Sequence, residues 1–503
     1  MKKHIVKLSF LRLTVVALLF AFGCDTKELL NPAPPTSLSD LEAFTTPDRV
    51  LQQVNGLYAT LHNGQFLGGR MQMYHEVRGE DFQNRLGNGV TGLFTWQYNQ
   101  VATNAEPLNA WTQGFLTINR ANVFLEGLQN NPNAVSAELA DDYRAEARFV
   151  RAMAYYHLVN LYARPFAFQN GNTPGLPLRL VAETNPNNRN LARSTVAQVY
   201  DQILADLNFA EENLPLTYPT APLRVTRAHR NAAIAFKTRV LLTMQRYADV
   251  VTEARKIVPQ TAAPFSSTSG VTHNIEANVR TVFPTGTGTS YTGPEAIFSL
   301  PFNSNNVPGV QNSLAHYFAR PGAGDGFGNG EYFLDRGTQG IFNNSAFTAT
   351  DARRTQLTIT VPLGTPPDNL TFLTKFTHNP ATDWAPIIRY SEVLLNYAEA
   401  LVRVNNTVDP LALALLNAVR GRSVPAAVYA SFATANDLLN AILLERRIEL
   451  MGEGFRGIDI TRQLLPLPAK TGVQGTVPIT SQQYIFPIPQ AELDNNNLMV
   501  QNN

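Results

Sequence analysis

The chain of 503 residues contains a single cysteine, Cys24. A disulfide within one molecule needs two thiols and a thiolate metal site needs several, so both are excluded. Net charge is also nearly absent, at +1 with histidine neutral, and this leaves no electrostatic footprint for binding nucleic acid. Beyond residue 22 no apolar run reaches the roughly 20 residues that a transmembrane helix needs.

The N-terminal residues suggest a use for the lone thiol. Residues 1–12 carry four basic side chains, residues 13–22 are apolar, and the small Gly23 precedes Cys24. A basic start followed by a short apolar core is the pattern of an export signal. With the Gly-Cys pair, the segment resembles the lipobox of bacterial lipoprotein signals, in which the cysteine is acylated and becomes the new N-terminus.

We therefore expect residues 1–23 to be a lipoprotein signal peptide and Cys24 to carry the lipid. Residues 24–35 are polar and contain proline without any periodicity, so we interpret them as a tether to a body that spans residues 36–503. Ordinary secretion, with a cut near Ala21 or Gly23 and a free thiol, is the alternative.

Motifs of familiar enzymes and metal sites are missing. The eight histidines are scattered without metal-binding spacing, and no G-x-S-x-G or phosphate-binding glycine motif is present. The stretch GAGDGFGNGE brings Asp325, Asn329 and Glu331 close together as in a calcium loop, but Phe327 stands where an oxygen ligand is needed. We predict no cofactor, no metal and no enzymatic activity.

Helical periodicity covers most of the body. Thr46 offers a capping hydroxyl before proline and an acid, so a helix should begin there and run to about His62. Further helices are predicted at 107–128, 141–165, 195–213, 227–244, 247–257, 386–404 and 410–420. Helix, short turn and helix of this size are typical of tetratricopeptide repeats. The predicted fold is mainly α, with tetratricopeptide-like helix pairs as a scaffold.

Two stretches, 64–104 and 259–386, lack helical spacing and are rich in glycine, asparagine and aromatics. Long irregular segments inside a helical protein usually carry function, so we expect a loop-rich ligand region with short strands. Aromatic side chains there can stack on sugar rings, and amides and charged groups can bind sugar hydroxyls. The predicted ligand-binding residues are Arg78, Asp81, Arg85, Trp96, Tyr98, Asn99, Tyr291, Tyr317 and Trp384. Trp111, on a helix, is predicted to be core.

A block of four acids and four bases lies near the C-terminus: Glu445, Arg446, Arg447, Glu449, Glu453, Arg456, Asp459 and Arg462. Glu445 and Glu449 are one helical turn apart and have the residue types of a glycosidase pair. Such an enzyme keeps one acid protonated, whereas nearby arginines favour ionisation of both. We interpret the block as a structural ion network, and Glu80 with Asp81 as a loop anchor.

Six segments, in this order, resemble successive blocks of the SusD/RagB family: AEARFVRAMAYYHLVNLYARPF, TVAQVYDQILADLNFAEENLP, IIRYSEVLLNYAEALVRVN, LNAVRGR, ILLERRIELMGEGFRGIDITR and YIFPIPQAELDNNNLMVQNN. The resemblance implies a lipid-anchored outer-membrane protein facing the cell exterior, with no catalytic residues. It also implies a partner, a SusC-like TonB-dependent transporter, to which the protein hands a captured oligosaccharide. A peptide-binding member of the family and a secreted tetratricopeptide-type interaction scaffold are the alternatives.

Overall fold

The computed structural model describes residues 42–285, 291–322, 328–363 and 368–502. Its longer α-helices are α3 (Pro47–Leu61), α4 (Arg70–Val77), α6 (Ala105–Asn130), α7 (Ala137–Tyr162), α8 (Val196–Asn213), α10 (Arg230–Thr243), α11 (Tyr247–Ile257), α15 (Tyr390–Asn405), α16 (Pro410–Ser423) and α17 (Ala435–Glu449). Shorter helices are α5 (Leu93–Gln97), α9 (Ala221–Thr226), α12 (Val279–Val282), α13 (Leu314–Phe318), α14 (Ala352–Leu357), α18 (Arg456–Arg462) and α19 (Gln490–Asn495).

The strands are short and pair only in twos within the described residues. They are β1 (Phe82–Asn84), β2 (Ala296–Leu300), β3 (Tyr332–Leu334), β4 (Thr358–Leu363), β5 (Asp368–Leu373) and β6 (Ala385–Arg389). The antiparallel pairs are β1 with β3, β2 with β6 and β4 with β5. Single 3-10 turns lie at Phe168–Gly171, Pro186–Asn188, Ile341–Asn343, Pro425–Ala427 and Gln482–Tyr484.

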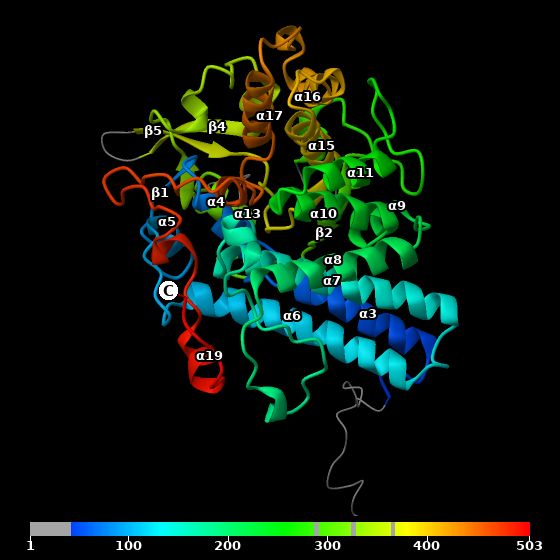
Figure 1. The fold of residues 1–503 in the computed structure, drawn as a ribbon. Coiled ribbons are helices and arrows are strands. Elements are labelled where there is room, and N and C mark those ends of the chain that lie inside the picture. The colour runs from blue at the N-terminus through cyan, green and yellow to red at the C-terminus, as the bar shows by residue number, and fades with distance from the viewer. Residues whose placement is uncertain (1–41, 286–290, 323–327, 364–367, 503) are drawn as a thin grey trace, which may run out of the picture.

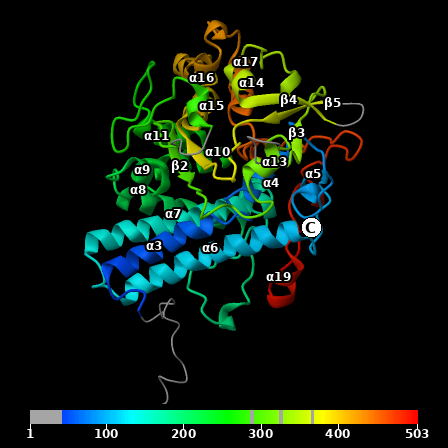
Figure 2. The ribbon, with the colours of Figure 1, turned by 180° about the vertical axis from the view of Figure 1, so that it is seen from behind.

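The long helices form one continuous array. Along the chain, α3 packs on α6, α6 on α7, α7 on α8, α8 on α10, α10 on α11, α11 on α15, α15 on α16 and α16 on α17. Both views show α3, α6 and α7 side by side as one layer, with the later helices stacked away from it (Figures 1 and 2). Stacking on sequence neighbours is the arrangement of helical repeats, and it confirms the predicted fold class.

Helix ends follow the capping residues in the sequence. The Thr46 side chain accepts a hydrogen bond from the backbone N–H of Arg49, and α3 ends before His62 as predicted. At α8, Thr195 and Gln198 form a reciprocal capping box. These local hydrogen bonds satisfy donors that the first helical turn leaves free.

Close packing of α6 against α7 uses small residues. A Cβ added at Gly114 would lie 2.6 Å from Leu158, so these two helices approach through the glycine. The small side chains Ala147 and Ala154 of α7 are fully buried. Trp111 is 4% exposed and packs edge-on against Tyr162, which confirms its prediction as a core residue.

Two sequence predictions are wrong in detail. Residues 64–104 are not free of regular structure, because α4, β1 and α5 lie there. All eight residues of α4 are buried, including Arg70 and Glu76, so the helix has no polar face and leaves no amphipathic stripe to detect. The helix predicted from residue 386 begins at Tyr390 instead, since residues 385–389 pair with β2 as β6.

The predicted loop-rich region at 259–386 contains short strands and short helices between irregular segments. The β1–β3 pair joins it to the other predicted loop region, because Phe82 pairs with Leu334 and Asn84 with Tyr332. The predicted signal peptide, Cys24 and the predicted tether lie outside the described residues. Across the part of the chain that is described, no helix is both long and apolar enough to cross a membrane.

Candidate functional site

Trp96 and Tyr98 are core residues. Trp96 is 5% exposed, and its indole Nε1 donates to the carbonyl of Phe82 at 2.9 Å. Tyr98 is 1% exposed, and its hydroxyl lies 2.9 Å from the carbonyl oxygen of Arg78 and 3.0 Å from that of Pro468. The interpretation of both as exposed loop aromatics is therefore wrong, because the backbone of neighbouring segments covers them and satisfies their polar atoms.

Arg78 and Asp81 are buried as well, which corrects their placement at a ligand surface. The guanidinium of Arg78 donates to the carbonyl of Tyr484, and burial lowers the pKa of this side chain. Asp81 accepts from the backbone N–H of Ile341 at 2.8 Å and pairs with Arg447. These contacts join chain segments far apart in the sequence, so the loop-anchor interpretation of Asp81 is confirmed.

Arg85 and Asn99 remain at least partly exposed. Arg85 donates from Nε to the carbonyl of Gly330 at 2.7 Å and also binds the carbonyl of Asn329. Asn99 donates to the side chain of Gln97 at 3.1 Å. Arg85 thus bridges the two predicted loop regions through backbone acceptors, which leaves little of its guanidinium for a ligand.

The three remaining predicted aromatics differ in exposure. Tyr317 is fully buried, and its hydroxyl donates to the carbonyl of Gln311 at 2.6 Å. Tyr291 is 9% exposed, whereas Trp384 is only partly buried. Of the five predicted aromatic side chains, Trp384 therefore offers the most surface to a ligand, and Tyr317 is corrected to a core residue.

Tyr291 and Trp384 form a stacked pair. Their ring centroids are 5.3 Å apart and their planes differ by 12°. The hydroxyl of Tyr291 donates to Asp383 Oδ1 at 3.1 Å, and Asp383 also accepts from the backbone N–H groups of Thr377 and His378. Because the Asp383 carboxylate is held by three donors, it fixes the Tyr291 ring on which the Trp384 indole stacks. We call Tyr291 and Trp384 the aromatic platform.

Burial dominates the electrostatics of this pair. It raises the pKa of the Tyr291 hydroxyl, and the nearby Asp383 raises it further, so the phenol stays protonated as a donor. Burial also raises the pKa of Asp383, against the opposing effects of His378 and the backbone donors. The platform therefore combines an uncharged aromatic surface with a polar support, which suits stacking on a sugar ring.

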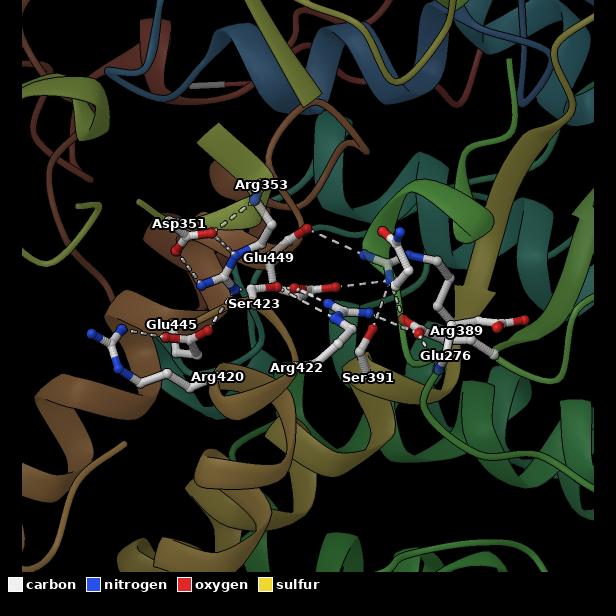
Figure 3. A network of polar contacts seen from close by, with 12 residues as sticks. Glu276, Asp351, Arg353, Arg389, Ser391, Arg420, Arg422, Ser423, Glu445 and Glu449 are labelled. Atoms are coloured by element: carbon white, nitrogen blue, oxygen red, sulfur yellow. Dashed lines mark hydrogen bonds and ion pairs between the residues drawn. The ribbon is translucent and has the colours of Figure 1, made fainter. Parts of the chain in front are cut away.

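The C-terminal charge block is a buried ion network (Figure 3). Glu449 Oε1 lies 3.0 Å from Arg389, and its Oε2 lies 3.1 Å from Arg353 and also contacts Arg422. Arg353 lies in α14, Arg389 at the end of β6 and Arg422 in α16. The network thus ties α17 to three other elements, as the structural interpretation of the block predicts.

Glu449 is held ionised. Burial alone would raise its pKa, but Arg422, Arg389 and Arg353 outweigh that effect and hold the pKa well below its ordinary range. A glycosidase acid must instead stay protonated near neutral pH. Arg456, which belongs to the same charge block, binds Glu80 instead, with Nε 3.0 Å from Oε2.

Metal-binding geometry is absent from the described residues, where no group of three or more histidine, cysteine, aspartate or glutamate side chains could hold an ion. In the glycine-rich stretch, Asp325 and Phe327 lie outside the described residues. Glu331 is fully buried and binds His316 at 3.1 Å and the hydroxyl of Thr91. Its role is therefore to hold the segment that contains β3 against the α4–α5 region.

Comparisons with known proteins agree with this architecture. A family model described as starch-binding, associating with the outer membrane, matches residues 39–242, and the SusD family model matches residues 344–503. The crystal structure of a SusD superfamily protein from Bacteroides fragilis is 32% identical, with a TM-score of 0.77, and covers 91% of this chain and 99% of its own. The chain belongs to the SusD/RagB family.

Curated relatives in Formosa agariphila point the same way. SusD-like protein P38 is 23% identical over 99% of both chains. SusD-like protein P25 is 24% identical over 49% of this chain, and that match spans only 46% of P25. Members of the SusD/RagB family are in general carbohydrate-binding surface proteins and not enzymes.

The contact between Asp383 and Tyr291 that supports the aromatic platform was not predicted from the sequence. Asp383 directly precedes Trp384 in the stretch ATDWAP, but its partner Tyr291 is 92 residues away. Aspartate in a turn often accepts backbone hydrogen bonds, so Asp383 in this proline-containing stretch is a local signal for a fixed carboxylate. The identity of its partner depends on the β2–β6 pairing, which brings residues near 296–300 to residues near 385–389.

Proposed function

We propose that this protein is a cell-surface lipoprotein that captures an oligosaccharide and hands it to a partner SusC-like TonB-dependent transporter. Membership of the SusD/RagB family supports the class of function. The Tyr291–Trp384 pair is the observation that carries the ligand class, because a fixed, partly exposed indole is a stacking surface for a sugar ring. In this proposal Trp384 contacts the ligand, and Tyr291 holds the Trp384 side chain in position.

Anchoring belongs to the same proposal. The basic start, the apolar core and the Gly23-Cys24 pair supply a lipoprotein signal, and acylation of Cys24 would fix the helical body at the membrane surface through the tether at 24–35. Two or three acyl chains hold a protein stably at a membrane, whereas one holds it only marginally. A ligand-binding protein held beside its transporter delivers ligand at a high effective concentration.

Binding without catalysis is also proposed. The acids nearest to a catalytic arrangement in sequence, Glu445 and Glu449, are both paired with arginines inside the ion network. At Glu449 these arginines hold the carboxylate form, so this acid is not suited to donate a proton to a glycosidic oxygen.

The test is a glycan array probed with the purified full-length protein in detergent, followed by calorimetric titration of the best ligand. We expect saturable binding to an oligosaccharide with no turnover of it, and co-purification of a β-barrel transporter from the native membrane. Binding confined to peptides would select the peptide-binding alternative. Binding only to folded proteins, with no glycan or transporter, would select the interaction scaffold.

A further inference from the structure

A cavity of about 410 Å³ lies between the end of α3 and the segment at 306–312, and none of its lining residues belongs to the Tyr291–Trp384 pair. Four amide side chains line it: Asn63, Gln65, Asn306 and Asn312. We call it the amide pocket. His62 and the exposed Ala59 complete its α3 side, and no lysine, arginine, aspartate or glutamate is among the lining residues.

The pocket is built by a close crossing of two chain segments. A Cβ added at Gly64 would lie 2.0 Å from the carbonyl oxygen of Pro308, so only glycine permits this approach. Directly after α3, the Asn63 side chain accepts from the backbone N–H of Gln65 at 2.9 Å and fixes the turn. On the other side, Asn312 Nδ2 donates to the Pro308 carbonyl at 3.2 Å.

Two polar atoms of the pocket residues lack partners. Nε2 of His62 and Oδ1 of Asn312 are buried and have no hydrogen-bond partner among the described residues. Burial lowers the pKa of His62 to about 4, so its imidazole is neutral near pH 7. The four carboxamide side chains and the imidazole that line the pocket are all at least partly exposed. They therefore offer uncharged donors and acceptors to a ligand.

We propose that the amide pocket is a second ligand site that takes an uncharged, hydroxyl-rich group, namely a sugar unit of a neutral oligosaccharide. This inference rests on the proposed function and specifies its substrate class. A hydroxyl both donates and accepts, so it matches carboxamides and a neutral imidazole. A sulfate or carboxylate group would enter without any counter-charge, which opposes its burial.

The pocket is connected to the aromatic platform through the β2–β6 pair. Leu300 at the end of β2 pairs with Ala385 at the start of β6, and Trp384 directly precedes that start. Phe302 lies two residues after β2, and its ring centroid is 5.7 Å from that of His62. Both sites are thus attached to the same end of one two-stranded ribbon.

A blocking variant tests the site with little risk to the fold. Ala59 is exposed on α3 and lines the pocket, so Ala59→Leu narrows the pocket while keeping a good helix former. The matched control is Gln52→Leu, an exposed position on the same helix about 10 Å earlier along its axis. Asn312→Ala removes one amide and is the second test variant.

The probes are neutral malto-, cello-, xylo- and laminari-oligosaccharides, with oligogalacturonate as the acidic comparison, titrated calorimetrically into the full-length protein. We expect Ala59→Leu and Asn312→Ala to weaken binding of the preferred neutral oligosaccharide by about tenfold, as for loss of one or two hydrogen bonds, and Gln52→Leu to leave it unchanged. Residual binding by Trp384→Ala should disappear when Ala59→Leu is added.

Two outcomes overturn the second site while leaving the proposed function standing. In the first outcome, the Ala59→Leu and Gln52→Leu variants have the same affinity for neutral oligosaccharides, whereas the Trp384→Ala variant binds them weakly. The other is a wild-type protein that binds oligogalacturonate and none of the neutral probes. If the wild-type protein binds no glycan at all, the proposed function and the second site fail together.

Discussion

The indole N–H of Trp96 donates to the backbone carbonyl of Phe82 at 2.9 Å, deep in the main hydrophobic core. Truncation removes a large packed ring and leaves this carbonyl without its donor. We predict that Trp96→Ala lowers the free energy of unfolding by about 3 to 5 kcal/mol, as for other buried tryptophans. Chemical denaturation measures this loss.

The matched control for Trp96→Ala is Val90→Ala, because Val90 is 57% exposed in the same chain region and should change stability by less than about 0.5 kcal/mol. Glycan affinity per folded molecule should be the same in both variants. A stable Trp96→Ala protein with lost affinity would return Trp96 to the ligand surface.

Trp96 also marks what the sequence could and could not predict. Local signals were sufficient to predict α3 and α11. For α3 the signal is the capping side chain of Thr46, and for α11 it is the spacing of polar and apolar residues within the helix. They were insufficient at Trp96 and Tyr98, which sit among glycines and amides typical of exposed loops yet are covered by distant segments. Burial of this kind depends on tertiary contacts and leaves no periodic pattern.

The ion network shows the same division. Its residue types predicted a structural ion network, and the ion pairs are present and buried. The choice of partner was not predictable, since Arg456 pairs with Glu80, which lies 376 residues away. Likewise Trp384 was a candidate from its loop, but its stacking on Tyr291 needed the pairing of β2 with β6.

Removing the Glu449 carboxylate should be costly. The variant Glu449→Ala leaves Arg353, Arg389 and Arg422 with an uncompensated buried charge. We predict a loss of about 3 to 5 kcal/mol in the free energy of unfolding at pH 7. Asp249→Ala is the control, because the Asp249–Arg246 pair is roughly half exposed and such pairs contribute less than about 1 kcal/mol.

The pH dependence of this loss has a definite sign. The pKa of Glu449 is depressed in the folded protein, so its contribution is present above the unfolded value of about 4.3 and falls as the pH drops below it. The difference between wild type and Glu449→Ala should therefore shrink in acid. A difference that stays constant from pH 7 to pH 3 would contradict an ionised Glu449.

His157 should make the protein sensitive to mild acid. Both of its ring nitrogens are buried without hydrogen-bond partners in the described structure, and burial, aided by Arg239, lowers its pKa to about 3. The unfolded chain takes up a proton near pH 6.5, so stability falls as the pH drops below that value. We predict that His157→Phe reduces the stability difference between pH 8 and pH 5 by about 2 kcal/mol.

Tyr156→Phe is the matched control for His157→Phe. Tyr156 is buried beside His157, and burial raises its pKa to about 12, so it does not titrate between pH 5 and pH 8. This variant should lose stability equally at both pH values, through its hydrogen bond to Thr243. An unchanged pH dependence in His157→Phe would show that the imidazole takes up protons in the folded state.

Lipidation of Cys24 is tested by Cys24→Ser, which removes the acyl acceptor. Serine differs from cysteine by a single side-chain atom, so we expect no change in the melting temperature of the purified protein. We predict that the wild type partitions into the detergent phase and the variant into the aqueous phase. Retention of the variant on membranes washed with high salt would mean that something other than Cys24 anchors the protein.

Trp384→Ala tests the aromatic platform itself. Trp384 is partly exposed and stacks on Tyr291, so its removal should cost about 1 kcal/mol of stability, in the range of one aromatic pair, rather than the cost of a core tryptophan. A micromolar ligand has only about 8 kcal/mol of binding free energy, and each 1.4 kcal/mol is a factor of ten. Loss of the main stacking surface should therefore weaken binding of the preferred oligosaccharide by at least about tenfold.

Tyr291→Phe keeps the supporting ring and removes only the hydroxyl that donates to Asp383, so it should bind more tightly than Trp384→Ala. Equal affinities for Trp384→Ala and wild type in calorimetric titration would remove Trp384 from the ligand site and leave the amide pocket to be tested alone.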